Sequence, residues 1–219
     1  MAGPASNGAS RRTGRRLRRL FLLSPARVNG VRAGYLLNPD ASFALARQFH
    51  RDGLPLAEVF SFTSGLYFRG KITYARRFAS EPDCAIRVIT PNAGLLDPSV
   101  VLTASTLRTF GEVDIDADDP RYTEPLRRDA RALARMLAED GVAVLLGSIA
   151  TSKYRDVLLD VFGTRLVFPR DFVGRGDMSR GGLLLRSARD GVELPYETVL
   201  GATLRGTRPA RLPPLPRTR

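Results

Sequence analysis

The feature that most constrains the fold of this chain is an alternation of short apolar runs with longer amphipathic stretches. Residues 20–23, 59–62, 86–89, 142–146 and 166–168 form short runs that mostly end in Pro, Gly or Ser, which predicts buried strands. The amphipathic stretches predict helices over residues 42–51, 67–79, 123–139 and 152–162. This alternation favours an α/β fold, in which a mixed sheet with parallel strands is covered by helices.

The predicted helix over 123–139 has the most complete set of sequence signals. Thr123 offers a capping hydroxyl, and Pro125 stands in the first turn, where its missing N–H costs nothing. Apolar residues then recur every three or four positions, which predicts one buried face. Gly141 is expected to end this helix.

The basic residues of the chain are concentrated at its two ends. The chain has 219 residues, 43% of them apolar, which fits a single compact domain. Six arginines and no acid lie within residues 1–19, and five arginines and no acid lie within residues 205–219. Subtracting these six and five arginines from the formal net charge of +12 leaves a net charge of about +1 for the residues between the two ends. We therefore predict disordered basic arms at residues 1–17 and 206–219 around an α/β domain at residues 18–205.

Such arms allow two interpretations. Arginines on a mobile segment release counterions from a phosphate backbone, which gives affinity for nucleic acid without sequence specificity. Alternatively, the arms are solvated ends of a protein from a genome that encodes arginine frequently. The sequence leaves both interpretations open.

Several classes of site are excluded by composition. Cys84 is the only cysteine and His50 the only histidine, so we expect no intramolecular disulfide, no zinc site and no Ser/His/Asp triad. We expect His50 to be a surface residue, and we expect no cofactor. The longest apolar runs are far shorter than the roughly 20 residues that span a bilayer, and the N-terminal region lacks a signal-peptide apolar segment. These features predict a cytoplasmic protein without a membrane segment.

The loops after the predicted strands hold most of the candidate binding residues. Ligands of such sheets bind outside the carboxyl ends of the strands. Four polar or glycine-bearing loops occupy these positions, at residues 24–27, 63–71, 90–98 and 147–154. Two of them open helices with hydroxyls and a lysine nearby, which suits a phosphate or another anion. From these loops we select Ser24, Arg27, Tyr67, Lys71, Asn92, Ser152 and Lys153 as ligand-binding or nucleic-acid-binding candidates.

A fifth segment, residues 172–182, is rich in glycine and arginine. Glycine allows close approach of a ligand, and Arg175 and Arg180 can each bind a phosphate bidentately. Asp177 is placed to hold one of the arginines. We expect both arginines to be exposed, so that replacing them weakens ligand binding with little effect on stability. The alternative is a surface turn before a helical stretch at residues 183–188.

Two further clusters are interpreted conservatively. The acidic run over residues 112–119 lacks the glycine and the final glutamate of a calcium loop, so we expect a solvated loop. Tyr67, Phe68 and Tyr74 lie among basic residues, a mixture that can stack on nucleic-acid bases. At helical spacing such aromatic residues are more often part of a core.

Four of these segments, in order, resemble the YaaA peroxide-stress family and related uncharacterised bacterial and phage proteins. Residues 23–27 (LSPAR) resemble the Ser-Pro-Ala-Lys strand exit of the family, and residues 89–96 (ITPNAGLL) resemble its strand followed by Tyr-Gly-Leu-Leu. Residues 148–154 resemble its Ala-Ser-x-Tyr helix start, and residues 174–180 (GRGDMSR) are similar to its Ala-Arg-Gly-x-Met-Ala-Arg segment. The chain departs from the family in having Arg27 in place of Lys and Asn92 or Ala93 in place of the turn Tyr.

The resemblance implies a compact mixed α/β fold with a cleft, binding of distorted or single-stranded DNA, and a role in oxidative-stress tolerance. Our leading hypothesis is therefore a DNA-binding protein. The alternative is an enzyme on a nucleoside, nucleotide or nucleobase, of glycosidase or base-exchange type, in which Asp97 or Asp177 supplies the catalytic carboxylate and the arginines hold a phosphate-bearing small molecule. A ribosome-binding or partner-binding protein anchored by the arms is a third possibility.

Overall fold

The computed structural model describes residues 16–79 and 85–212. The strands in these residues are β1 (Leu17–Leu23), β2 (Leu54–Pro55), β3 (Ile86–Ile89), β4 (Leu95–Leu96), β5 (Val101–Leu102), β6 (Leu137–Leu146), β7 (Leu166–Pro169) and β8 (Tyr196–Thr198). The α-helices are α1 (Val31–Leu37), α2 (Ala44–Asp52), α3 (Leu56–Ser64), α4 (Leu66–Phe78), α6 (Ala104–Gly111), α7 (Pro120–Ala134), α8 (Ser152–Phe162) and α9 (Asp177–Asp190). Two short 3-10 helices, η1 (Gly163–Arg165) and η2 (Arg170–Phe172), flank β7.

The central sheet is mixed and has the strand order β4-β3-β1-β6-β7-β8. The four inner strands β3, β1, β6 and β7 run parallel, while β4 and β8 pair antiparallel at the two edges. Residues 20–23 of β1 are fully buried, as expected for a parallel strand covered on both faces. The predicted α/β fold class is thus confirmed.

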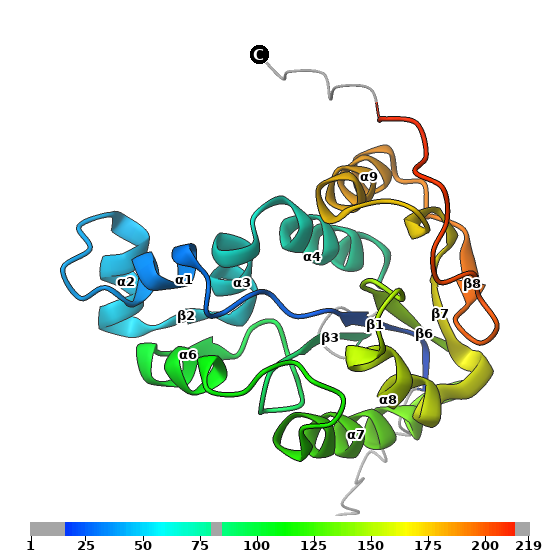
Figure 1. Ribbon diagram of the computed structural model, residues 1–219, viewed down its shortest axis with the longest axis horizontal. Helices are drawn as coiled ribbons and strands as arrows, with labels where there is room; N and C mark the ends of the chain where they lie inside the picture. Colours follow the sequence, from blue (N-terminus) through cyan, green and yellow to red (C-terminus); the bar gives the residue numbers. More distant parts are fainter. Residues whose placement is uncertain (1–15, 80–84, 213–219) are drawn as a thin grey trace, which may run out of the picture.

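Helices cover both faces of this sheet (Figure 1). Helices α4 and α9 lie against one face, and α7 and α8 lie against the other. A separate group, formed by α1, α2, α3, α6 and the small antiparallel pair of β2 and β5, lies beyond the carboxyl end of β1. The connection from β1 to β3 includes α4, and the connection from β6 to β7 is α8, on the opposite face of the sheet. Connections that diverge in this way open a crevice between two neighbouring strands.

One predicted strand is wrong. Residues 59–62 belong to helix α3, whose buried residues are Leu56, Ala57, Val59 and Phe60. This spacing is helical, and the short window of four apolar residues concealed it. Residues 63–71 are consequently neither a loop nor a strand exit. They are the end of α3 and the first part of α4, joined at Gly65, which has a φ of +63°.

The predicted helix over 123–139 is displaced towards the N-terminus. It is capped by Asp119, whose side chain accepts from the backbone N–H of Arg121, and Pro120 occupies the first turn. Helix α7 ends at Ala134, and Glu139 already belongs to β6. Gly141 does not end a helix but lies inside β6, where the pairing with β1 shifts register and a Cβ would lie 2.6 Å from the carbonyl oxygen of Leu17.

The expected arms fall mainly on residues outside the described ranges, as does Cys84. Leu17, assigned to the N-terminal arm, is the first residue of β1. Residues 206–212 have no regular secondary structure, but they lie beside the segment that precedes α9. Gly174, with a φ of +73°, is packed against the carbonyl of Thr207, and Leu212 faces Gly182.

Helices α4 and α9 approach each other closely because glycines face each other at their crossing. A Cβ on Gly70 would lie 2.7 Å from the carbonyl oxygen of Gly181, and a Cβ on Gly181 would lie 2.8 Å from the carbonyl oxygen of Leu66 and 2.9 Å from the Cα of Tyr67. Any side chain at these positions would push the helices apart. This contact also fixes the backbone of Tyr67 against α9.

Replacing Gly181 by Ala should therefore lower the free energy of unfolding by about 1–3 kcal/mol, the range for overpacking a close contact. The matched control is Gly182→Ala one position along, where the nearest atom is Leu212 Cδ1 at 3.8 Å. Gly182→Ala should stabilise by about 0.5–1 kcal/mol through helix propensity alone. Urea denaturation of both variants measures these free energies of unfolding. Equal changes in the two variants would contradict a close contact between α4 and α9 at Gly181.

Candidate functional site

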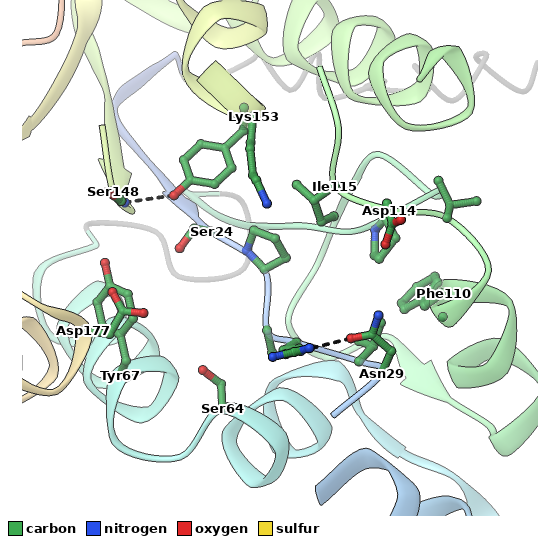
Figure 2. A pocket seen from close by; sticks show the side chains of 18 residues that line it. Ser24, Asn29, Ser64, Tyr67, Phe110, Asp114, Ile115, Ser148, Lys153 and Asp177 are labelled. Atoms are coloured by element: carbon green, nitrogen blue, oxygen red, sulfur yellow. Dashed lines mark hydrogen bonds between the residues drawn. The ribbon is translucent and has the colours of Figure 1, made fainter. Parts of the chain in front are cut away.

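A cleft of about 540 Å³ lies at the carboxyl ends of β1, β3 and β6. Its size lies within the range of pockets that hold small molecules. Figure 2 shows Tyr67 and Asp177 on one side of the cleft and Phe110 and Asp114 on the other. Ser24, the first residue after β1, lies between these walls.

Ser24 is held from behind by a buried lysine. The backbone N–H of Ser24 donates to the carbonyl of Leu146, which continues the β1–β6 ladder. Lys71 of α4 lies with its Nζ 2.9 Å from Ser24 Oγ and 2.5 Å from the Ser24 carbonyl oxygen. The Lys71 side chain is fully buried, with Nζ 4.5 Å from the centre of the Tyr67 ring and 4.9 Å from that of Phe68.

Burial lowers the pKa of Lys71 to about 7, and the negative charge of Asp177 opposes this shift. No carboxylate of the described residues forms an ion pair with the Lys71 amine. The amine is therefore balanced between its charged and neutral forms near neutral pH.

Two tyrosine hydroxyls lie beside Ser24. The Tyr154 hydroxyl accepts from the backbone N–H of Ser148 at 2.8 Å. The Tyr67 hydroxyl is buried and makes no hydrogen bond of normal geometry in the described residues, although the Arg180 guanidinium lies near it. Burial raises the pKa of both tyrosines above the ordinary value, so both hydroxyls stay protonated.

The rim of the cleft carries charges of both signs. Arg27 is exposed and donates to the Asn29 side chain at 3.2 Å, and the exposed Lys153 points its amine towards the cleft (Figure 2). Asp114 and Asp177 supply the carboxylates, and Phe110 and Ile115 supply apolar surface. This mixture suits a ligand with an anionic group at one end and an apolar or aromatic body.

The structure brings together about half of the residues selected from sequence. Ser24, Arg27, Tyr67, Lys153 and Asp177 line the cleft. Lys71 does not line it, but it contacts Ser24 directly from behind.

The remaining loop candidates lie elsewhere. Ser152 lines a smaller adjoining hollow with Asp114 and Lys153. The Asn92 side chain donates to the carbonyl of Thr109 at 2.9 Å, and Asp97 pairs with Arg87 and accepts from Ser99. Asp97 does not line the cleft, and its contacts stabilise the turn after β4.

The expectation that Arg175 and Arg180 are both exposed is wrong for Arg180. Its side chain is buried, donates twice to the carbonyl of Phe172 and pairs with Asp177 at 3.4 Å. Arg175, half-buried, donates to the carbonyl of Asp171 and to Ser179 and lines a hollow shared with residues 208–212. Both arginines lie in or beside α9, which begins at Asp177 and not at residue 183.

Sequence reasoning missed Tyr154, Ser148, Ser64 and Phe110 as parts of the site. Tyr154 lies within one of the loops selected from sequence, so a search for hydroxyls at strand exits would have found it. Phe110 comes from α6, and nothing in the sequence connects that helix to the end of β1.

Of the aromatic residues considered for base stacking, Phe68 and Tyr74 are fully buried in the core. Asp114, expected in a solvated loop, is exposed yet lines the cleft.

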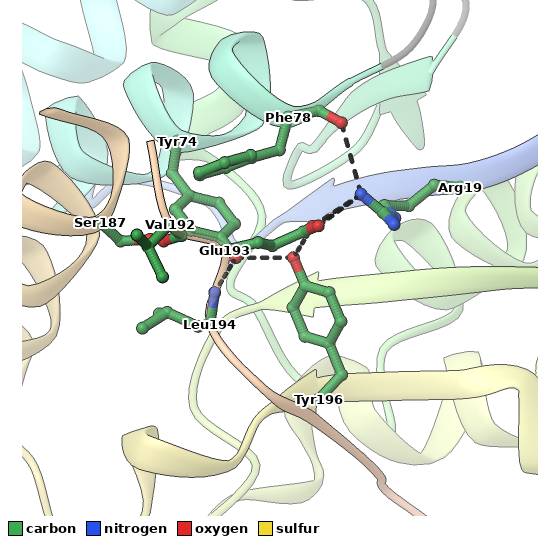
Figure 3. Close-up of polar contacts among 8 residues, drawn as sticks. All are labelled: Arg19, Tyr74, Phe78, Ser187, Val192, Glu193, Leu194 and Tyr196. Atoms are coloured by element: carbon green, nitrogen blue, oxygen red, sulfur yellow. Dashed lines mark hydrogen bonds and ion pairs between the residues drawn. The ribbon is translucent and has the colours of Figure 1, made fainter. Parts of the chain in front are cut away.

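Arg19, counted among the basic residues of the N-terminal arm, belongs to the folded domain. Its guanidinium contacts Glu193 at 2.7 Å, and Glu193 accepts from Tyr196, which in turn contacts Tyr74 (Figure 3). Burial raises the pKa of Tyr74 to about 12. This network joins β1 to the segment before β8, so Arg19 is unavailable as a free cation for a phosphate.

The remaining expectations concern metals, His50 and membranes. In residues 16–79 and 85–212, no group of three or more His, Cys, Asp or Glu side chains is arranged to hold a metal ion. His50 is exposed and lies 3.0 Å from the carbonyl oxygen of Asn38. No helix of the described ranges has the length and apolar character needed to cross a bilayer.

Comparisons with known proteins leave the site to be interpreted from its own geometry. No protein-family model matches the chain, and no curated protein or solved structure does so either. The resemblance to the YaaA family therefore stays a prediction.

The depressed pKa of Lys71 predicts a specific dependence of stability on pH. Between pH 7 and the ordinary lysine pKa of 10.5, the unfolded chain keeps the Lys71 proton while the folded protein releases it. The unfolded state then binds more protons, so the free energy of unfolding should rise with pH by up to about 1.4 kcal/mol per pH unit. The measurement is urea denaturation of the wild type and of Lys71→Met at pH 7, 8 and 9. Subtracting the two series removes the other titrating groups, and a difference that does not change with pH would contradict the shift.

Proposed function

We propose that this protein binds nucleic acid and that the cleft after β1 receives one nucleotide of the bound strand. The observation that carries the proposal is the cleft itself: about 540 Å³, with cationic side chains at its rim and apolar side chains within. A phosphate paired with Arg27 or Lys153 would leave the base near Phe110 and Ile115.

The charge of the chain supports a polyanionic ligand. The formal net charge is +12, and four arginines at positions 11, 12, 15 and 16 precede the first strand. These residues can add a salt-dependent affinity for the phosphate backbone that the cleft alone does not supply. In this proposal the cleft binds one nucleotide, and the basic segments bind the phosphate backbone of the rest of the strand.

A free nucleotide or nucleoside is the second candidate ligand, and the size of the cleft favours it. A cleft of this volume encloses one nucleotide but not a duplex. Under this alternative the protein acts on a phosphate-bearing small molecule, and the arginines before β1 do not contribute to binding.

Binding of a fluorescent single-stranded DNA oligonucleotide, followed by anisotropy at 50 and 200 mM salt, tests the proposal. Affinity should fall steeply with salt, because phosphate contacts release counterions. Arg27→Ala should weaken binding about 10-fold, the lower end of the range for a charge-assisted hydrogen bond. The matched control is Arg131→Ala, which removes an exposed arginine of α7 that does not line the cleft and should have little effect.

The two ligands are distinguished in the full-length protein by replacing the arginines at 11, 12, 15 and 16 with Gln. Weaker oligonucleotide binding with unchanged binding of a free nucleoside monophosphate supports a nucleic-acid ligand that contacts both the cleft and these arginines. Unchanged binding of both ligands favours the free nucleotide. Absence of binding at micromolar protein for both ligands contradicts the proposal.

We further propose a cytoplasmic location and, from the resemblance to the YaaA family alone, a role in oxidative-stress tolerance. Survival of a deletion strain under peroxide, with and without the Arg27→Ala protein, tests that role.

A further inference from the structure

The pairing of Ser24 with Lys71 places a hydroxyl in the cleft and an amine directly behind it. Ser24 Oγ lies 2.9 Å from Lys71 Nζ, and Ser24 lines the cleft whereas Lys71 does not. Because Lys71 is fully buried, it cannot contact a ligand and acts only through Ser24. In other proteins such a Ser-Lys pair activates a serine nucleophile.

The choice of lysine at this position is unusual for this chain. Of its 34 basic residues only two are lysines, Lys71 and Lys153. An arginine stays charged in proteins, whereas a buried lysine can lose its proton and become a base. The lysine thus fits a role that requires a change of protonation.

The hydrogen-bond geometry accommodates the neutral amine. One N–H of Lys71 can donate to the carbonyl oxygen of Ser24, 2.5 Å away, while the nitrogen lone pair accepts the proton of Ser24 Oγ. The charge of Asp177 acts on Lys71, and both Asp177 and Arg180 of α9 act on the neighbouring hydroxyls of Tyr67 and Tyr154.

A hydroxyl is also available for a developing negative charge. The Tyr67 side chain is 6% exposed and lines the cleft, and its hydroxyl makes no hydrogen bond of normal geometry in the described residues, although the Arg180 guanidinium lies near it. An unpartnered buried hydroxyl costs about 1–3 kcal/mol unless a ligand satisfies it. On the other side, a Cβ on Gly147 would lie 2.8 Å from Ser24 Cβ and 2.9 Å from the Tyr154 hydroxyl, so Ser24 and Tyr154 flank the same point.

We propose that Ser24 is the nucleophile of an acyl-transfer reaction on a carboxylic ester, with Lys71 as its general base. The inference shares the cleft of the proposed function but does not require the substrate to be a nucleotide. Arg27 and Lys153 select an ester that carries an anionic group.

Each step of the reaction balances. Ser24 Oγ attacks the carbonyl carbon and gives its proton to Lys71 Nζ, while the Tyr67 hydroxyl donates to the oxyanion. The bond between the carbonyl carbon and the alcohol oxygen breaks, and the leaving alcohol takes the proton from Lys71. Water then attacks the Ser24 ester and gives a proton to Lys71, and the carboxylic acid leaves as Ser24 regains the proton. The sum is ester plus water to acid plus alcohol.

The test uses the full-length protein and an alkyl fluorophosphonate, which forms a bond from serine oxygen to phosphorus and releases fluoride. Intact-mass measurement and peptide mapping should locate one adduct on Ser24, with Ser64 of the same cleft unlabelled. Labelling should be lost in Ser24→Ala, fall at least 10-fold in Lys71→Met, and persist in Ser105→Ala, an exposed serine of α6. In the wild type, the rate should rise with pH through the Lys71 pKa of about 7 and level off only at higher pH, where the neutral amine is dominant.

The wild-type pH profile keeps the test decisive even if Lys71→Met does not fold. A folded wild type that is not labelled on Ser24, a rate that does not depend on pH between 6 and 8, or a folded Lys71→Met that is labelled as fast as the wild type overturns the proposal. Labelling without oligonucleotide or nucleotide binding contradicts the proposed function alone, and binding without labelling contradicts this inference alone.

Discussion

The site depends on one buried contact, in which the Lys71 amine of α4 meets the carbonyl and hydroxyl of Ser24 at the end of the central strand β1. Burying an amine without a carboxylate partner costs free energy, and this cost appears as the depressed pKa of Lys71. The surrounding structure keeps the Lys71 amine in this place. Helix α4 supplies the Tyr67 and Phe68 rings that lie next to the amine, and α9 packs closely against α4 at Gly181. The same crossing fixes Tyr67 at the wall of the cleft.

The position of the cleft follows from the order of the strands. Because the connections after β1 and β6 diverge to opposite faces of the sheet, the loops that follow them leave a crevice that side chains do not fill. The group of helices beyond β1 closes this crevice on the far side with Phe110 and Asp114 (Figures 1 and 2). Polar groups from separate regions of the chain thereby meet around Ser24.

The alternation of apolar and amphipathic segments was enough to predict the α/β class and the central strands β1, β3, β6 and β7. It was not enough for α3, because a four-residue apolar run has no distinguishable period. It also misplaced α7 and the start of β6, because Asp119 caps the helix earlier than expected and Gly141 lies in β6 beside a register shift. Strand-exit reasoning found Ser24 and Lys153 because carboxyl ends of parallel strands share one edge. Tyr67 was selected from a segment wrongly expected to follow a strand, and it reaches the cleft from the start of α4. It misjudged Arg180, since whether an arginine pairs with a carbonyl inside the fold or with a ligand outside depends on tertiary packing that glycine-rich sequence does not reveal.

The central claim is that the Lys71 amine is a buried base beside Ser24, and a direct titration by NMR tests it. The chain contains only two lysines, so labelling lysine with ¹³C at Cε gives two resolved signals that Lys71→Met and Lys153→Ala assign. The account predicts that the Lys71 signal titrates near pH 7, as the pKa of about 7 requires. A Lys71 signal that titrates at the ordinary lysine value of 10.5 would show a permanently charged amine and would contradict the account.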